Sequence, residues 1–128
     1  MTDIETSADI ERLVNAFYAR VRQDNQLGPV FDDVVRVNWE NHLPHIVTFW
    51  NTVLLGSTDY AGNPVAVHLA LGTKTPLNPA HFERWLALFT ETVDAQFTGI
   101  VAENAKIRAR SIATVLQTKL FAAGLLAD

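Results

Sequence analysis

Apolar residues repeat at helical spacing along most of this chain, and that repeat constrains the fold more than any other feature. After a possible cap at Ser7, apolar side chains follow the series of a single buried helical face. No segment alternates with a period of two for long enough to form a strand, so the sequence predicts an all-α domain. The first stripe consists of Ile10, Leu13, Val14, Phe17, Tyr18 and Val21.

Four more helices are predicted from similar stripes and from start and stop signals. One runs over about residues 39–55, and Pro44 implies either a later start or a bent first turn. Asn63-Pro64 and Asn78-Pro79 each combine a capping side chain with a proline suited to a first helical turn. The first pair opens a short helix, the second a helix to about residue 98, and the last helix covers about residues 100–122. The inward positions are His42, Ile46, Phe49, Trp50 and Val53, then Phe82, Trp85, Leu86, Phe89, Val93 and Phe97, and finally Val101, Ala105, Ile112, Leu116 and Leu120.

Length and composition narrow the class of protein. The 128 residues predict one domain, and the absence of cysteine excludes disulfides, zinc ribbons, iron–sulfur clusters and thiol catalysis. A net charge of -4 with scattered basic residues argues against nucleic acid as a partner. No apolar run approaches the roughly 18 residues of a membrane span, and the acidic N-terminus does not resemble a signal peptide. We therefore expect a cytoplasmic protein without a membrane partner.

His68 lies in the middle of the predicted short helix, which is otherwise apolar almost all round. A buried imidazole needs partners for its ring nitrogens, and no Asp, Glu, Ser or Thr lies within one helical turn. Two interpretations stay open at this point. The histidine is either a core residue satisfied from elsewhere, or it offers a nitrogen to a metal.

Three other helices each place one polar-tipped group on an inward face: Tyr18, His42 and Trp85. Burying such groups without partners costs on the order of 1–3 kcal/mol each, and an ordinary core would use Phe and Leu instead. Their number suggests a cavity with a metal on one side and a small polar ligand on the other. The aromatic residues that could wall a flat, apolar cofactor in this cavity are Phe31, Phe49, Trp50 and Phe82.

Four segments along nearly the whole chain resemble the group III truncated haemoglobins, shortened globins with a two-over-two helical sandwich around haem. The segments are FYARVRQDNQLGPVF at 17–31, HLPHIVTFWNTVLLG at 42–56, YAGNPVAVHLAL at 60–71 and HFERWLALF at 81–89. The resemblance implies a single truncated globin domain over residues 1–128 and haem b, iron protoporphyrin IX, as cofactor.

The same resemblance implies a role for each unusual residue. His68 matches the proximal ligand of the haem iron, and Tyr18, His42 and Trp85 match the residues of the distal pocket. Phe31 and Trp50 match aromatic residues packed against haem, and Phe49 lies beside Trp50. Dioxygen, nitric oxide, carbon monoxide or peroxide are the implied ligands, with a reductase as a possible partner.

The expected chemistry follows from the distal donors. Hydrogen bonds to a partly anionic oxygen ligand would slow its release, which suits redox chemistry of oxygen, nitric oxide or peroxide better than oxygen transport. Whether the chain is an enzyme stays open; nitric oxide dioxygenase-like and peroxidase-like activities are both compatible with these donors.

Two histidines keep alternative assignments. His81, near the start of a helix, is a second candidate for the iron ligand and a candidate for a haem propionate contact. His45, three residues after His42, faces the cofactor edge or solvent. Two rival classes also remain: a helical protein whose four histidines bind a non-haem metal, and a cofactor-free interaction domain.

Overall fold

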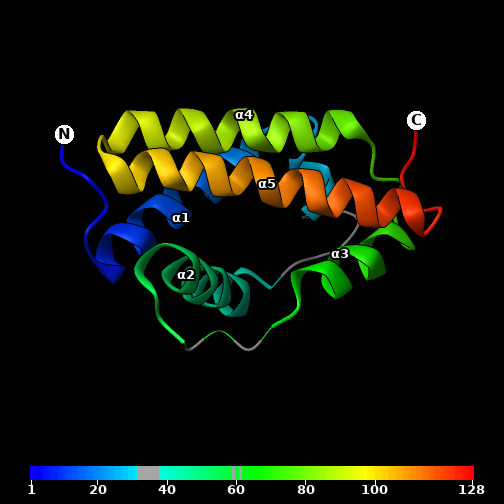
Figure 1. The fold of residues 1–128 in the computed structure, drawn as a ribbon. Helices are drawn as coiled ribbons and strands as arrows, with labels where there is room; N and C mark the ends of the chain where they lie inside the picture. The colour runs from blue at the N-terminus through cyan, green and yellow to red at the C-terminus, as the bar shows by residue number, and fades with distance from the viewer. Residues whose placement is uncertain (32–37, 59, 61) are drawn as a thin grey trace.

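The computed structural model describes residues 1–31, 38–58, 60 and 62–128, which form five helices (Figure 1). No β-strand forms within these residues; Leu77 and Leu126 make one isolated bridge. Residues 32–38 show no clear helical period in the sequence, which predicts a short connector there, and all of them except Asn38 lie outside the described part of the chain. The helices are α1 (Ser7–Gln23), α2 (Trp39–Leu55), α3 (Pro64–Gly72), α4 (Pro79–Gln96) and α5 (Ile100–Ala122).

The predicted starts of α3 and α4 are confirmed. The Asn63 side chain accepts a hydrogen bond from the backbone N–H of Ala66, and Asn78 does the same for His81. The predicted start of α1 is wrong by one residue, because Thr6 rather than Ser7 is the cap and forms a capping box with Asp9.

The predicted bounds of α2 are confirmed, and of the two effects expected of Pro44 the later start does not occur. This helix begins at Trp39 and carries Pro44 in its second turn. The missing amide hydrogen of the proline affects one intrahelical bond only, so the segment stays helical. At the other end of the molecule, α4 ends at Gln96, two residues before the predicted end.

The helices form the two-over-two arrangement that the resemblance implied. In Figure 1, α4 and α5 lie side by side, with α1 and α2 below them. Helix α1 packs against α2 and α4, α4 packs against α5, and the short helix α3 packs against α5. This is the all-α globin fold. No helix in the described residues is both long enough and apolar enough to cross a membrane.

The predicted core is most accurate in α1, where all six residues of the stripe are buried. In α5 the stripe is partly different, because Val101 and Ile112 are only half-buried. Small residues replace them on the inward face and allow close approach of α5 to its neighbours. The buried alanines of this helix are Ala102, Ala105, Ala109 and Ala113.

Helices α2 and α3 bury much less than their apolar sequences predict. Trp50 is the only fully buried residue of α2, and α3 has none. Both helices border a cavity, described below, so their inward residues are half-covered by protein.

A carboxylate near the N-terminus caps α5, although the two are far apart in the sequence. Gly99, the residue before α5, provides no side-chain cap, and Asp3 accepts hydrogen bonds from the backbone N–H groups of Val101 (2.9 Å) and Ala102 (2.8 Å). Gly99 has φ +143°, and a Cβ there would collide with the Asp3 carboxyl group. Asp3 therefore attaches the N-terminal segment to the α4–α5 corner.

We expect Asp3→Ala to lower the free energy of unfolding at pH 7 by about 1 kcal/mol, the usual contribution of a helix cap. Burial raises the pKa of Asp3, but the backbone hydrogen bonds outweigh it, so the pKa is lowered overall. The stabilisation is thus complete above the unfolded pKa, near 4, and is lost as pH falls through the lowered folded pKa. Urea unfolding between pH 7 and pH 2 should show the variant and parent converging in acid. Glu11→Ala, which removes an exposed carboxylate of α1, is the control; an equal effect there would contradict the capping role.

Candidate functional site

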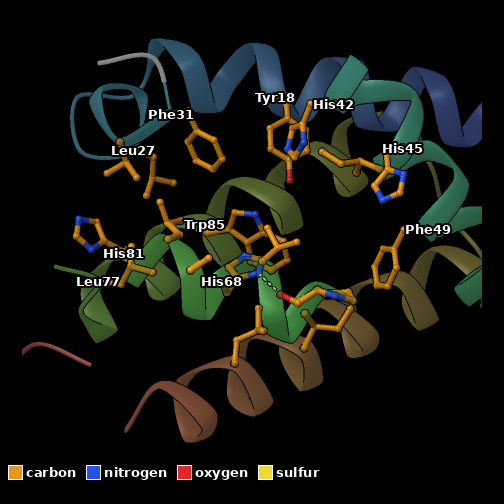
Figure 2. A pocket seen from close by; sticks show the side chains of 18 of the residues that line it. Tyr18, Leu27, Phe31, His42, His45, Phe49, His68, Leu77, His81 and Trp85 are labelled. Carbon is orange, nitrogen blue, oxygen red and sulfur yellow. Dashed lines mark hydrogen bonds between the residues drawn. The ribbon is translucent and has the colours of Figure 1, made fainter. Parts of the chain in front are cut away.

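A cavity of about 710 Å³ lies between the α1–α2 side of the molecule and helix α3, with α4 and α5 closing it from the other directions (Figure 2). Most of the side chains around it are apolar. Pockets of this volume that are mostly apolar with a few polar groups are typical of cofactor and small-molecule sites. The nine candidate site residues all line this one cavity, and so does Phe82, the remaining aromatic residue expected in its wall. The nine are Tyr18, Phe31, His42, His45, Phe49, Trp50, His68, His81 and Trp85.

His68 is held by the start of its own helix. Its ring Nδ1 lies 2.7 Å from the carbonyl oxygen of Pro64, four residues earlier. A carbonyl only accepts hydrogen bonds, so Nδ1 carries the proton and Nε2 keeps the lone pair of the neutral ring. Burial lowers the pKa of His68, and the hydrogen bond with Pro64 opposes this only in part. The ring is therefore neutral near pH 7, with one nitrogen satisfied and the other a potential metal ligand.

This hydrogen bond settles part of what the sequence left open. The partner of the His68 ring nitrogen is a backbone carbonyl and not an acidic or hydroxyl side chain. The signal that could have found it is the proline at the first position of α3, since the carbonyl four residues before a helical side chain lies within its reach.

His81 has the opposite arrangement, although it also lines the cavity. The backbone N–H of Asn78 donates to His81 Nδ1 at 3.1 Å, which completes a capping box at the start of α4. Nδ1 is therefore an acceptor, and the proton of the neutral ring is on Nε2. A nitrogen that carries a proton cannot bind a metal, so this geometry argues against His81 as a ligand.

Tyr18 supplies a hydroxyl on the side of the cavity away from His68. The residue is only 8% exposed, and its hydroxyl points into the cavity (Figure 2). Burial raises the pKa of the Tyr18 phenol to about 12, and an interaction with the Trp85 indole opposes part of this rise. The phenol therefore stays protonated at neutral pH and can donate a hydrogen bond.

Trp85 is placed by a stack of aromatic rings. Its indole stacks on Phe89 with 5.7 Å between ring centroids, and Phe89 stacks on Trp50 at 5.0 Å. Phe17 meets the edge of Trp85 from α1 at 5.6 Å. Residues of α1, α2 and α4 thus fix the plane of the indole, and Trp85 is half-buried beside the cavity.

His42 is half-buried next to Tyr18, and the two ring centroids are 6.2 Å apart. Burial lowers the pKa of His42, and the nearby His45 and His68 lower it further. The imidazole is therefore neutral near pH 7 and can donate or accept a hydrogen bond according to its tautomer.

Sequence reasoning missed two aromatic residues beside this group. Trp39, the first residue of α2, lies 5.5 Å from the ring of Tyr18 and 5.7 Å from that of Phe31. Tyr60 lies 5.0 Å from the ring of His45 and 5.2 Å from that of Phe49. Trp39 begins a helix and Tyr60 is in a loop, so neither belonged to an apolar stripe.

His45 is exposed to solvent, one of its two predicted surroundings, and also lines the cavity; a contact with the edge of a cofactor stays a prediction. Gly62 allows the loop to approach His45 closely. A Cβ at this position would collide with the Tyr60 hydroxyl and would lie 2.7 Å from His45 Nε2. The close approach of the loop to α2 explains why a glycine is needed at this position.

The four histidines do not form a metal site with one another. Within the described residues, no three His, Asp or Glu side chains lie close enough to hold a metal ion together. A metal at this cavity would therefore have at most two of these described side chains as ligands and would need its other ligands from elsewhere.

Comparisons with known proteins agree with this geometry. The model of the bacterial-like globin family matches residues 3–120. The group 3 truncated haemoglobin ctb of Campylobacter jejuni is 35% identical over 118 residues, which cover 90% of this chain and 91% of that protein. The crystal structure of a group III truncated haemoglobin from Campylobacter jejuni superposes with a TM-score of 0.82 at 32% identity, covering 94% of this chain and 95% of the other.

The sequence match extends over nearly the whole chain, and the fold, which has an apolar cavity with a single neutral histidine on its short helix, agrees with it. The chain belongs to the bacterial-like globins, a family of haem proteins, and within them to the group III truncated haemoglobins.

Proposed function

We propose that this chain binds haem b through Nε2 of His68 and holds a small diatomic ligand, dioxygen above all, against donors from Tyr18 and Trp85. The observation that carries the proposal is the hydrogen bond from His68 Nδ1 to Pro64, which leaves the lone pair on Nε2. A histidine that binds a metal usually donates its other ring N–H to a carbonyl or carboxylate in this way, which fixes the tautomer and the ring orientation.

The remaining residues of the cavity fit a flat, largely apolar cofactor. Phe31, Phe49 and Trp50 provide ring surfaces, and the cavity is large enough for a cofactor and a small ligand. Haem iron, when bound by one histidine, supplies an open coordination position on its other face. Tyr18 and His42 lie across the cavity from His68, as Figure 2 shows, so they would face that position.

The distal residues favour a ligand that accepts hydrogen bonds. Tyr18 stays protonated, and the Trp85 indole can only donate. His42, neutral and half-buried beside Tyr18, is placed for a secondary role in ligand access or proton transfer. Because two donors would slow ligand release, we propose redox chemistry of oxygen, nitric oxide or peroxide, supported by a reductase, in preference to oxygen transport.

His68→Gly should abolish stable haem retention or make it depend on added imidazole, because no other histidine has a free lone pair at the same place. The measurement is haem content together with absorption spectra in the ferric, ferrous and carbon-monoxide forms. His81→Gly is the matched control and should keep the parent Soret band. A His68→Gly protein with normal haem content and an unchanged ferrous spectrum would refute the assignment.

Haem should also raise the melting temperature of the protein. The inward faces of α2 and α3 are only half-covered, so a ligand that fills the cavity binds the native state alone. Binding at a concentration of about 100 times Kd adds roughly 2.7 kcal/mol to the free energy of unfolding. Scanning calorimetry of the apoprotein and the haem-loaded protein measures this difference. Equal melting temperatures would argue against haem in this cavity.

Tyr18→Phe and Trp85→Phe should each speed dioxygen dissociation by roughly one to two orders of magnitude, since each deletes one donor to a partly anionic ligand. Carbon-monoxide dissociation should change much less, because that ligand is a weak acceptor. The effects should not add, since both donors share one acceptor. Stopped-flow measurement of both ligands tests this, with Phe17→Leu as a packing control in the same cluster. If both variants release dioxygen at the parent rate, the pocket does not hold the ligand by hydrogen bonds, and the proposed redox chemistry loses its support.

A further inference from the structure

A nearly buried carboxylate connects the end of α1 to α4. Oδ1 of Asp24 accepts a hydrogen bond from Nε of Arg84 at 2.7 Å; the side chain of Asp24 is 7% exposed and that of Arg84 is 44% exposed. Oδ2 of the same carboxylate accepts the backbone N–H groups of Gln26 (3.1 Å) and Leu27 (3.0 Å). One carboxylate therefore joins a helix end, the turn that follows it and a second helix.

Each of these three segments carries a part of the cavity wall. Asp24 is the C-terminal cap of α1, the helix that holds Tyr18. Arg84 directly precedes Trp85 in α4, and the side chain of Leu27 itself lines the cavity. The two proposed ligand donors are thus on the two helices that the ion pair joins.

Ring packing orients the Trp85 indole, because aromatic pairs prefer stacked or edge-to-face arrangements. The ion pair adds a link between two particular atoms, one near the end of α1 and one on α4. It is short, charge-assisted and directional, because one guanidinium N–H meets one carboxylate oxygen. Together with the ring contacts, it constrains the axial position of α4 relative to α1.

We propose that Asp24 and Arg84 are positioning residues that set the separation of the Tyr18 hydroxyl from the Trp85 indole, and so tune how firmly the pair holds a small polar ligand. This inference rests on the proposed function. The competing interpretation is a surface ion pair that adds stability and nothing else.

The chain contains a matched ion pair for comparison. Nζ of Lys106 lies 2.7 Å from Oδ1 of Asp94, the same distance, and also joins α4 to a neighbouring helix, here α5. Neither residue lines the cavity. Asp94→Asn therefore removes a charged link between α4 and α5 without touching the donors, while Lys106 keeps Glu103 as a second partner at 2.9 Å, and it is the control variant.

The test is Arg84→Gln, which breaks the link to α4 but leaves the hydrogen bonds from Asp24 to its own turn. In the haem-loaded protein, dioxygen dissociation should become faster by about two- to tenfold, while carbon-monoxide dissociation stays at the parent rate. In the diamagnetic carbon-monoxide form, the indole N–H resonance of Trp85 should shift, and that of Trp50 should not. Arg84→Lys, which keeps one charged donor, should restore most of the parent behaviour.

A double-mutant comparison separates positioning from stability. In a Tyr18→Phe background, Arg84→Gln should have much less effect on dioxygen release, because the pair it positions is already broken. The proposal is overturned if Arg84→Gln leaves the Trp85 resonance and the oxygen rate unchanged, if it alters both ligands equally, or if Asp94→Asn has the same effect. If Tyr18→Phe alone leaves oxygen release unchanged, the proposed function fails instead, and the Trp85 resonance still reports whether Arg84 positions the indole.

Discussion

The packing of the Phe89 ring against aromatic residues of three helices is the interaction on which the shape of the cavity depends. The ring stacks on Trp50 from α2 and on Trp85 within α4, and it meets Phe17 from α1 edge to face. Three helices are thereby fixed around one fully buried side chain. Aromatic pairs of this kind add about 0.5–1.5 kcal/mol each beyond the area that they bury. The cavity is next to this cluster, so the packing of these rings supports its wall.

Within those walls, the direction of single hydrogen bonds decides what each histidine can do. In both His68 and His81, the ring Nδ1 forms a hydrogen bond with a backbone group of the same helix or its cap. The partner of His68 is a carbonyl, which leaves Nε2 with a lone pair. The partner of His81 is an amide N–H, which leaves Nε2 with a proton. Two histidines of one cavity thus have opposite capacities for metal binding.

The sequence predicted the elements well where one local rule decides them. The Asn-Pro starts of α3 and α4 and the six buried residues of α1 follow from capping chemistry and from helical periodicity. It was less accurate where tertiary structure decides. The cap of α5 is Asp3, which comes from the other end of the chain. The inward face of α5 uses four alanines, of which the apolar stripe identified only Ala105.

The candidate site shows the same division. Residue types at helical spacing were enough to bring the nine candidates to one cavity, but not to give the contacts between them. Trp39 and Tyr60 contribute from a helix start and from a loop, where no periodicity marks them. The link between Asp24 and Arg84 joins positions 60 residues apart, and each alone looks like an ordinary surface charge.

The incomplete burial of α2 and α3 connects the fold to its proposed function. In a close-packed core, the inward surface of an apolar helix is almost entirely buried against protein neighbours. Here a helix as apolar as α3 has no fully buried residue, while α1, which carries many charges, has six. The difference arises because α1 packs against two helices, whereas α3 has protein on one side and the cavity on the other. The flat apolar cofactor proposed above would complete that core, between the lone pair of His68 and the hydroxyl of Tyr18.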